Sequence, residues 1–134
     1  MAGRHPKQQI IETNMRKLCD ALDEYLEEKY EEAYPLHPNR TERGKAGSVA
    51  YDGLFSTGTK FTLGYGSKSG RGYLVDIEII TLEKVHQQMR ETIEHDAVDF
   101  LKEHISDYFP TRELDIIKEG KVFKIVGDFS LGSL

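Results

Sequence analysis

The sequence predicts a two-layer α+β domain, in which a mainly antiparallel sheet of about five strands carries two long helices on one face. Two observations lead to this prediction. Apolar residues recur at three- and four-residue spacings over Lys7–Ala33 and again over Leu82–Phe109, as they do in half-buried helices. Elsewhere they alternate with polar residues, as in half-buried strands. The expected element order is α-β-β-β-α-β-β, in a single domain that spans residues 1–134.

The two helices have recognisable ends. The first is expected over Lys7–Ala33 and should stop before Pro35, because proline cannot continue a helix. The second is expected over Leu82–Phe109, with Thr81 as its N-cap and Pro110 directly after it.

The strands are predicted from alternation and from the turn residues between them. Five strands are expected, over Ser48–Ser56, Lys60–Tyr65, Tyr73–Ile79, Glu113–Lys118 and Lys121–Phe129. We interpret Thr57 and Gly58 as a turn between the first two. Between the second and third lies a glycine-rich, basic tip, whose backbone N–H groups could form an anion-binding concavity.

Composition limits the class of protein. The net charge is −5, which disfavours a dedicated nucleic-acid binder. Cys19 is the single cysteine, so a disulfide within the chain is excluded, and we interpret it as a small core residue. The sequence shows no signal peptide and no stretch long enough to span a membrane, so we expect a cytoplasmic protein.

The charges are unevenly distributed along the chain. From His37 to Gly72 six Lys and Arg residues stand against two acidic residues, a net charge of +4, so the remainder carries −9. This basic segment predicts a surface for an anionic partner, either an acidic peptide or a phosphate-bearing ligand. The residues expected to contact it are Arg40, Arg43, Lys45, Tyr65, Lys68, Arg71 and Tyr73.

The leading hypothesis is a non-enzymatic binding module, and two other classes stay open. Aromatic residues near these cations could stack single-stranded nucleic acid, RNA in particular. A small enzyme could use His86 or His104, which project onto the apolar stripe of the second helix, together with a carboxylate. The sequence contains no recognisable catalytic motif, and no cofactor is expected.

Two groups of carboxylates could be mistaken for metal or acid–base sites. Asp76 and Glu78 share one strand face, but their alternation with apolar residues is typical of a solvent-facing row. His95, with Glu91 and Asp99, forms a cluster of the kind that exposed helices produce by chance. No metal site is therefore expected.

The length of the helices predicts an assembly. A continuous helix of this size is roughly 40 Å long, whereas a compact chain of this length is roughly 36 Å across. A second subunit could cover the overhang, so we expect a homodimer with two-fold symmetry. The order of elements resembles that of small acidic secretion chaperones, and this resemblance implies a dimer that binds extended peptides.

Overall fold

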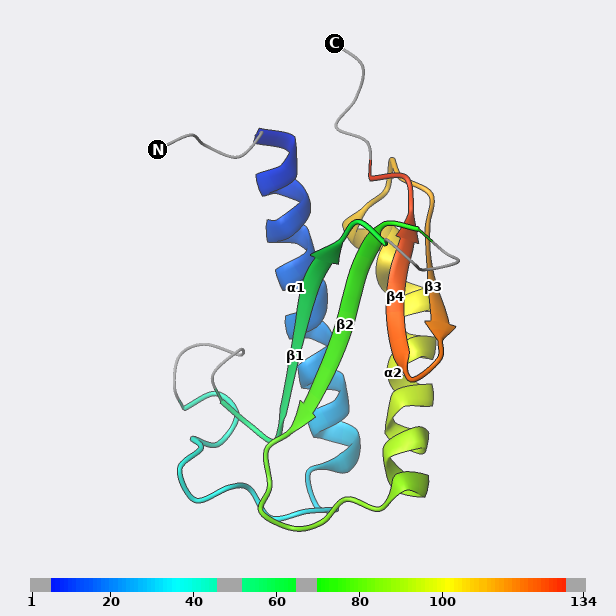
Figure 1. The fold of residues 1–134 in the computed structure, drawn as a ribbon. Coiled ribbons are helices and arrows are strands. Elements are labelled where there is room, and N and C mark those ends of the chain that lie inside the picture. Colours follow the sequence, from blue (N-terminus) through cyan, green and yellow to red (C-terminus); the bar gives the residue numbers. More distant parts are fainter. Residues whose placement is uncertain (1–5, 46–51, 65–69, 130–134) are drawn as a thin grey trace.

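The structure, a computed structural model, describes residues 6–45, 52–64 and 70–129 (Figure 1). It confirms the α+β class, with two helices and a four-stranded antiparallel sheet in the order α-β-β-α-β-β. The elements are α1 (Pro6–Tyr30), β1 (Phe55–Thr62), β2 (Gly72–Ile79), α2 (Gln87–Tyr108), β3 (Leu114–Glu119) and β4 (Val122–Gly127).

Over the described residues the sheet has four strands, one fewer than the number predicted. Residues 46–51 lie outside the described part, and of the predicted strand Ser48–Ser56 only its last two residues are in β1. Thr57 and Gly58 form no turn, because β1 runs through both of them without interruption. Gly58 is tolerated inside β1 because the residues on both sides of it, Thr57 and Thr59, remain paired with β2.

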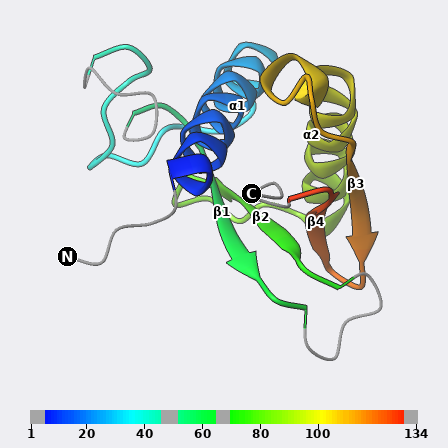
Figure 2. The ribbon, with the colours of Figure 1, turned by 90° about the horizontal axis from the view of Figure 1, so that it is seen from above.

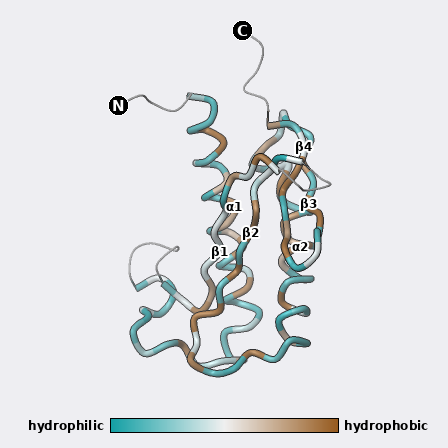
Figure 3. Tube along the Cα trace, in the orientation of Figure 1, coloured by the Kyte–Doolittle hydropathy of each residue, from teal (hydrophilic) through white to brown (hydrophobic). Residues whose placement is uncertain are grey.

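The strand order β1-β2-β4-β3 places β1 and β3 at the two edges. Viewed from above, both helices lie on the same side of the sheet (Figure 2). The hydrophobic stretches of β2 and β4 lie side by side at the centre (Figure 3). Tyr73, Val75 and Ile77 of β2 are buried toward the helices, as their alternation predicts. The opposite face carries no helix among the described residues.

The helices differ from the prediction mainly at the start of α2. The prediction for α1 is accurate to three residues. In α2, Thr81 is not the N-cap, because its hydroxyl accepts a hydrogen bond of 3.3 Å from the Glu83 amide in a local turn. The helix starts at Gln87 after an extended His86, and Leu82 is 73% exposed.

Candidate functional site

The loop between α1 and β1 directs a guanidinium inward, against the start of β1. Arg43 lies 3.1 Å from Asp52 Oδ1 and 3.2 Å from Glu27 Oε1. It also donates a hydrogen bond of 2.9 Å to the Phe55 carbonyl. Asp52 is only 1% exposed, so Arg43 supplies the cation that a buried carboxylate requires. Arg43, which the sequence predicted to contact a ligand, therefore bonds to partners within the chain.

Arg40 also makes internal contacts. Its Nε and Nη2 donate hydrogen bonds of 3.0 Å to the carbonyl oxygens of Gly53 and Asp52. These bonds satisfy backbone acceptors in the segment that enters β1. Lys45, by contrast, is exposed at the surface of the same loop.

Two side chains of α1, the Asp23 carboxylate and the Arg16 guanidinium, bond to Thr57 of β1. The Asp23 oxygens accept hydrogen bonds from the Thr57 hydroxyl (2.6 Å) and the Thr57 amide (3.2 Å). Arg16 donates to the Thr57 carbonyl at 2.9 Å and lies 3.8 Å from Asp23. Burial raises the pKa of Asp23 to about 6, and the bonds from Thr57 and the nearby guanidiniums oppose this rise.

Arg71 and Tyr73 lie at the opposite end of β1 and β2. Arg71 is exposed. Tyr73 is 5% exposed, and its ring packs edge-to-face on Phe61 and Phe129, with centroids 5.4 and 5.1 Å away. Phe61 remains 41% exposed. A ligand at this end would therefore meet a cation and an aromatic ring backed by a rigid cluster.

Two adjoining hollows separate α1 from this end of the sheet, and we call them together the tip groove. The first has a volume of about 150 Å³ and is lined by Gln8, Ile11, Phe61, Arg71, Tyr73 and Phe129. The second has a volume of about 360 Å³ and is lined by Glu12, Arg16, Gly58, Thr59, Phe61 and Tyr73. Phe61 and Tyr73 form the wall that the two hollows share.

A buried lysine fixes the point at which the hairpin tip leaves the sheet. Lys124 lies on the face opposite the helices, yet its side chain is only 1% exposed. Its Nζ donates a hydrogen bond of 2.6 Å to the Gly70 carbonyl and lies 3.4 Å from Glu119. Gly64 packs against Gly70 at a φ of +78°, where a Cβ would overlap the Gly70 carbonyl. Arg71 follows this fixed point directly.

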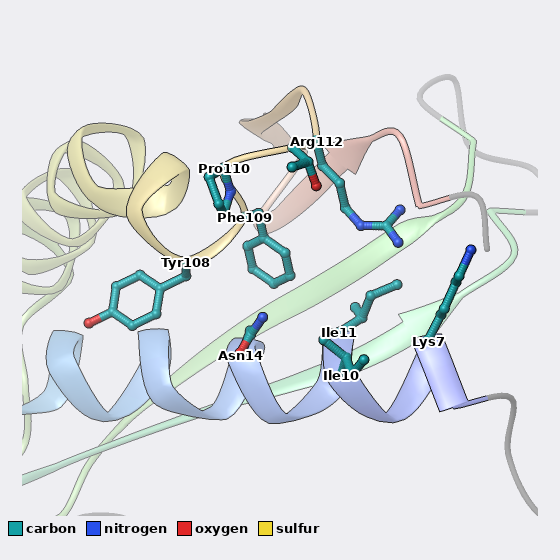
Figure 4. Close-up of a pocket in the computed structure, with 9 residues that line it drawn as sticks. Lys7, Ile10, Ile11, Asn14, Tyr108, Phe109, Pro110 and Arg112 are labelled. Atoms are coloured by element: carbon teal, nitrogen blue, oxygen red, sulfur yellow. The ribbon is translucent and has the colours of Figure 1, made fainter. Parts of the chain in front are cut away.

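A further hollow lies on the other side of α1, between its first turns and the corner that joins α2 to β3 (Figure 4). Its volume is about 190 Å³, and Ile10, Ile11 and Phe109 give it an apolar floor. Lys7 and Arg112 lie at one end of it, where Arg112 donates to the Asp128 carbonyl at 3.1 Å. Sequence reasoning missed this hollow because its walls come from opposite ends of the chain.

None of the histidines within the described residues lines these hollows. His86 precedes α2 and is exposed, so the expectation that it lies on the apolar stripe is wrong. The half-buried His104 ring packs on Phe100, with centroids 4.4 Å apart. His95 is exposed, 3.4 Å from Asp99.

The other reactive side chains have ordinary structural roles. Cys19 is buried, and burial raises the pKa of its thiol to about 12, so the thiolate is disfavoured. Asp76 and Glu78 are exposed on the helix-free face, as their alternation predicts. Within residues 6–45, 52–64 and 70–129, no three His, Cys, Asp or Glu side chains gather into a possible metal site.

The predicted ligand contacts thus fall into two groups, one at each end of β1. Arg40, Arg43 and Lys45 lie near Phe55, where the loop enters the strand. Arg71 and Tyr73 lie near Thr62, about 25 Å away along eight residues of strand. Tyr65 and Lys68 lie outside the described residues. A basic segment that is continuous in sequence therefore does not form a single described surface.

Comparisons with other proteins place the chain in a family. A protein-family model described as "Uncharacterised protein" matches residues 6–127, so the chain belongs to this family. A relative from Borreliella burgdorferi, also named "Uncharacterized protein", is 44% identical over 112 residues, or 84% of this chain and 88% of the relative. No solved structure matches the chain. Neither helix, over the described residues, is long and apolar enough to cross a bilayer.

Proposed function

We propose that this member of an uncharacterised family is a non-enzymatic binding module, which holds an acidic peptide segment of a partner in the tip groove. The observation that supports this function best is the exposed Arg71 beside the half-exposed ring of Phe61. The hollow that they share is also lined by Ile11, Tyr73 and Phe129, together with Gln8. An anionic side chain would pair with the guanidinium, and an apolar neighbour would cover the ring. Buried Cys19 is compatible with a cytoplasmic module.

An acidic peptide fits the groove better than a phosphate does. Ile11, Phe61 and Phe129 give the first hollow apolar walls, which a compact, strongly hydrated anion would not use. A peptide that alternates acidic and apolar residues uses both features. Arg40 and Arg43 have no part in this proposal because their guanidiniums stabilise the loop. Tyr65 and Lys68, which follow Gly64, remain proposed contacts.

The test is fluorescence anisotropy with a fluorescein-labelled hexapeptide of alternating valine and glutamate. Arg71→Ala should weaken binding several-fold, and the loss should shrink in about 0.15 M salt, where the Debye length is about 8 Å. Lys45→Ala is the matched control, because Lys45 is an exposed cation at the far end of β1. Equal effects of the two substitutions, or no binding at low salt, would refute the proposal.

We also propose that two copies associate as a two-fold homodimer in which each copy covers Ile10 on the first turns of α1 of the other. Ile10 is an apolar side chain that is 59% exposed. Size-exclusion chromatography with light scattering measures the mass directly. Ile10→Glu should convert a dimer into a monomer, whereas the mass of one chain at every concentration would exclude this proposal.

A further inference from the structure

The outer edge of β1 is divided into two halves. In a strand, alternate residues direct their backbone N–H and C=O groups to opposite sides. Thr57 directs both of its groups away from β2, because they bond to Asp23 and Arg16. Phe55, Thr59 and Phe61 have the same parity and therefore also face outward. Side chains bond to the Phe55 carbonyl and to both backbone groups of Thr57, and we call these two residues the capped half.

Thr59 and Phe61 form the open half. Among the described residues, no side chain or strand bonds to the outward N–H and C=O groups of these two residues. A sheet edge of this kind is a template for another strand, and proteins usually cover it or protect it with charge. Here α1 and the loop cover only the end near Phe55.

A hollow lies on each face of the sheet at the open half. The second hollow of the tip groove is on the helix side, next to Thr59 and Phe61. Another, of about 400 Å³, lies on the helix-free side. Its lining residues are Gly58, Thr59, Lys60, Leu74, Val75, Asp76 and Val122. Gly58 contributes to both hollows, and a Cβ built on it would meet nothing within 4 Å.

We propose that the open half of β1 binds an extended segment of the partner as an added antiparallel strand. The backbone of that segment bonds to Thr59 and Phe61, and its side chains alternate between the two hollows. Acidic residues enter the helix-side hollow, which Arg16 lines and which adjoins Arg71. Apolar residues enter the hollow on the helix-free side, against Leu74 and Val122. This inference rests on the proposed function, because it specifies how the acidic peptide is held.

Lys60 decides between a foreign peptide and a second copy of this chain. If two copies paired antiparallel about a two-fold axis through their open halves, Thr59 would lie opposite Phe61 of the other copy. Each Lys60 would then lie directly opposite the other Lys60, and like charges in that position destabilise a strand pair. Lys60 is exposed and forms no ion pair with another described residue, so no partner there offsets this repulsion, and a foreign strand is favoured over a second copy.

The first experiment removes the donor of the open half from the protein. Thr59→Pro deletes the outward N–H but leaves the ladder with β2 intact, and proline is tolerated on the outer side of edge strands. Affinity for the valine–glutamate hexapeptide should fall about tenfold, from the loss of one or two hydrogen bonds. Thr59→Val, which keeps the N–H, is the control and should bind as the unmodified chain does.

The second experiment keeps the protein unmodified, so it does not depend on how Thr59→Pro folds. N-methyl groups are placed on the glutamate amides of the hexapeptide, which the antiparallel arrangement directs at β1, or on the valine amides, which it directs away. Only the first peptide should lose binding. Equal affinities of both peptides would overturn strand addition, yet sensitivity to Arg71→Ala would leave the proposed function standing. If none of the peptides bound, both strand addition and the proposed function would be refuted.

Discussion

The capped and open halves of β1 belong to one strand and differ in what covers them. At Phe55 and Thr57, charged side chains of α1 and the following loop bond to the outward backbone groups. At Thr59 and Phe61, two hollows replace that cover. Among the described cations of the basic segment, Arg40 and Arg43 therefore complete the fold near Phe55, and Lys45, Lys60 and Arg71 remain at the surface.

The capped half carries an electrostatic cost that the open half does not. Asp23 is fully buried, and burial raises its pKa to about 6. Asp52 is almost as buried and depends on Arg43. Charged caps of this kind stabilise only while each partner is present, because a lone buried charge is strongly unfavourable. Substitutions should therefore separate the two halves by their effect on stability.

The largest effect is expected from Arg43→Ala. The substitution leaves Glu27 and Asp52 without their shared cation and removes a donor to the Phe55 carbonyl. Loss of one partner of a buried ion pair costs about 3 kcal/mol or more. Urea unfolding, followed by circular dichroism, should show a correspondingly lower midpoint.

Lys45→Ala is the control for Arg43→Ala, since it removes an exposed cation from the same loop. Exposed substitutions usually change stability by less than about 0.5 kcal/mol. If both variants unfolded at the same urea concentration as the unmodified chain, Arg43 would not be the cation that holds the capped half together.

The second prediction concerns Asp23 and pH. Because burial raises its pKa from 3.8 to about 6, the folded chain keeps this carboxyl protonated at pH values where the unfolded chain has lost the proton. The free energy of unfolding contributed by Asp23 should therefore fall as pH rises from about 4 to about 6. The full change corresponds to about 3 kcal/mol at the upper end.

Asp23→Asn isolates this contribution from those of other carboxyl groups. The variant cannot ionise, so the difference in unfolding free energy between it and the unmodified chain should vary with pH across that window and be constant above it. Urea titrations at several pH values measure the difference. A difference independent of pH would show that the buried carboxyl titrates as it does in water.

Alternation and proline positions were enough to predict α1, β2 and the final hairpin. They failed at Gly58, where glycine and threonine resemble a turn but the ladder with β2 continues through them. They failed again at Thr81, because the same residue type can cap a helix or close a local turn. Both failures concern local signals that tertiary pairing overrides.

The candidate site was harder to predict than the fold. Sequence places Arg43 and Arg71 in one basic segment, but only the packing of α1 against β1 shows that the first is internal and the second exposed. The open half depends on the strand order, which puts β1 at an edge. Threonine and phenylalanine at positions 59 and 61 do not indicate that the strand lies at an edge of the sheet.

The third prediction compares the two halves without any ligand. The Thr57 amide, bonded to buried Asp23, should exchange its hydrogen with water at least about tenfold more slowly than the Thr59 and Phe61 amides. Hydrogen exchange followed by NMR resolves each amide. Gly58 and Lys60, whose amides face β2 by parity, should also exchange slowly. Protection of Thr59 equal to that of Thr57 would mean that the outer edge is covered along its whole length.

The smallest effect on stability is expected from Lys60→Val, yet this variant tests why the open half does not pair with itself. Valine favours strands, and the substitution removes the charge that would lie opposite Lys60 of a second copy. The variant should therefore associate further through β1, whether the unmodified chain is a monomer or a dimer. Light scattering over a range of concentrations should show a larger mass than for Lys60→Arg, which keeps the charge. If both variants have the same mass at every concentration, like-charge repulsion at Lys60 is not what protects this edge, and a second copy becomes as suitable an occupant as an acidic peptide.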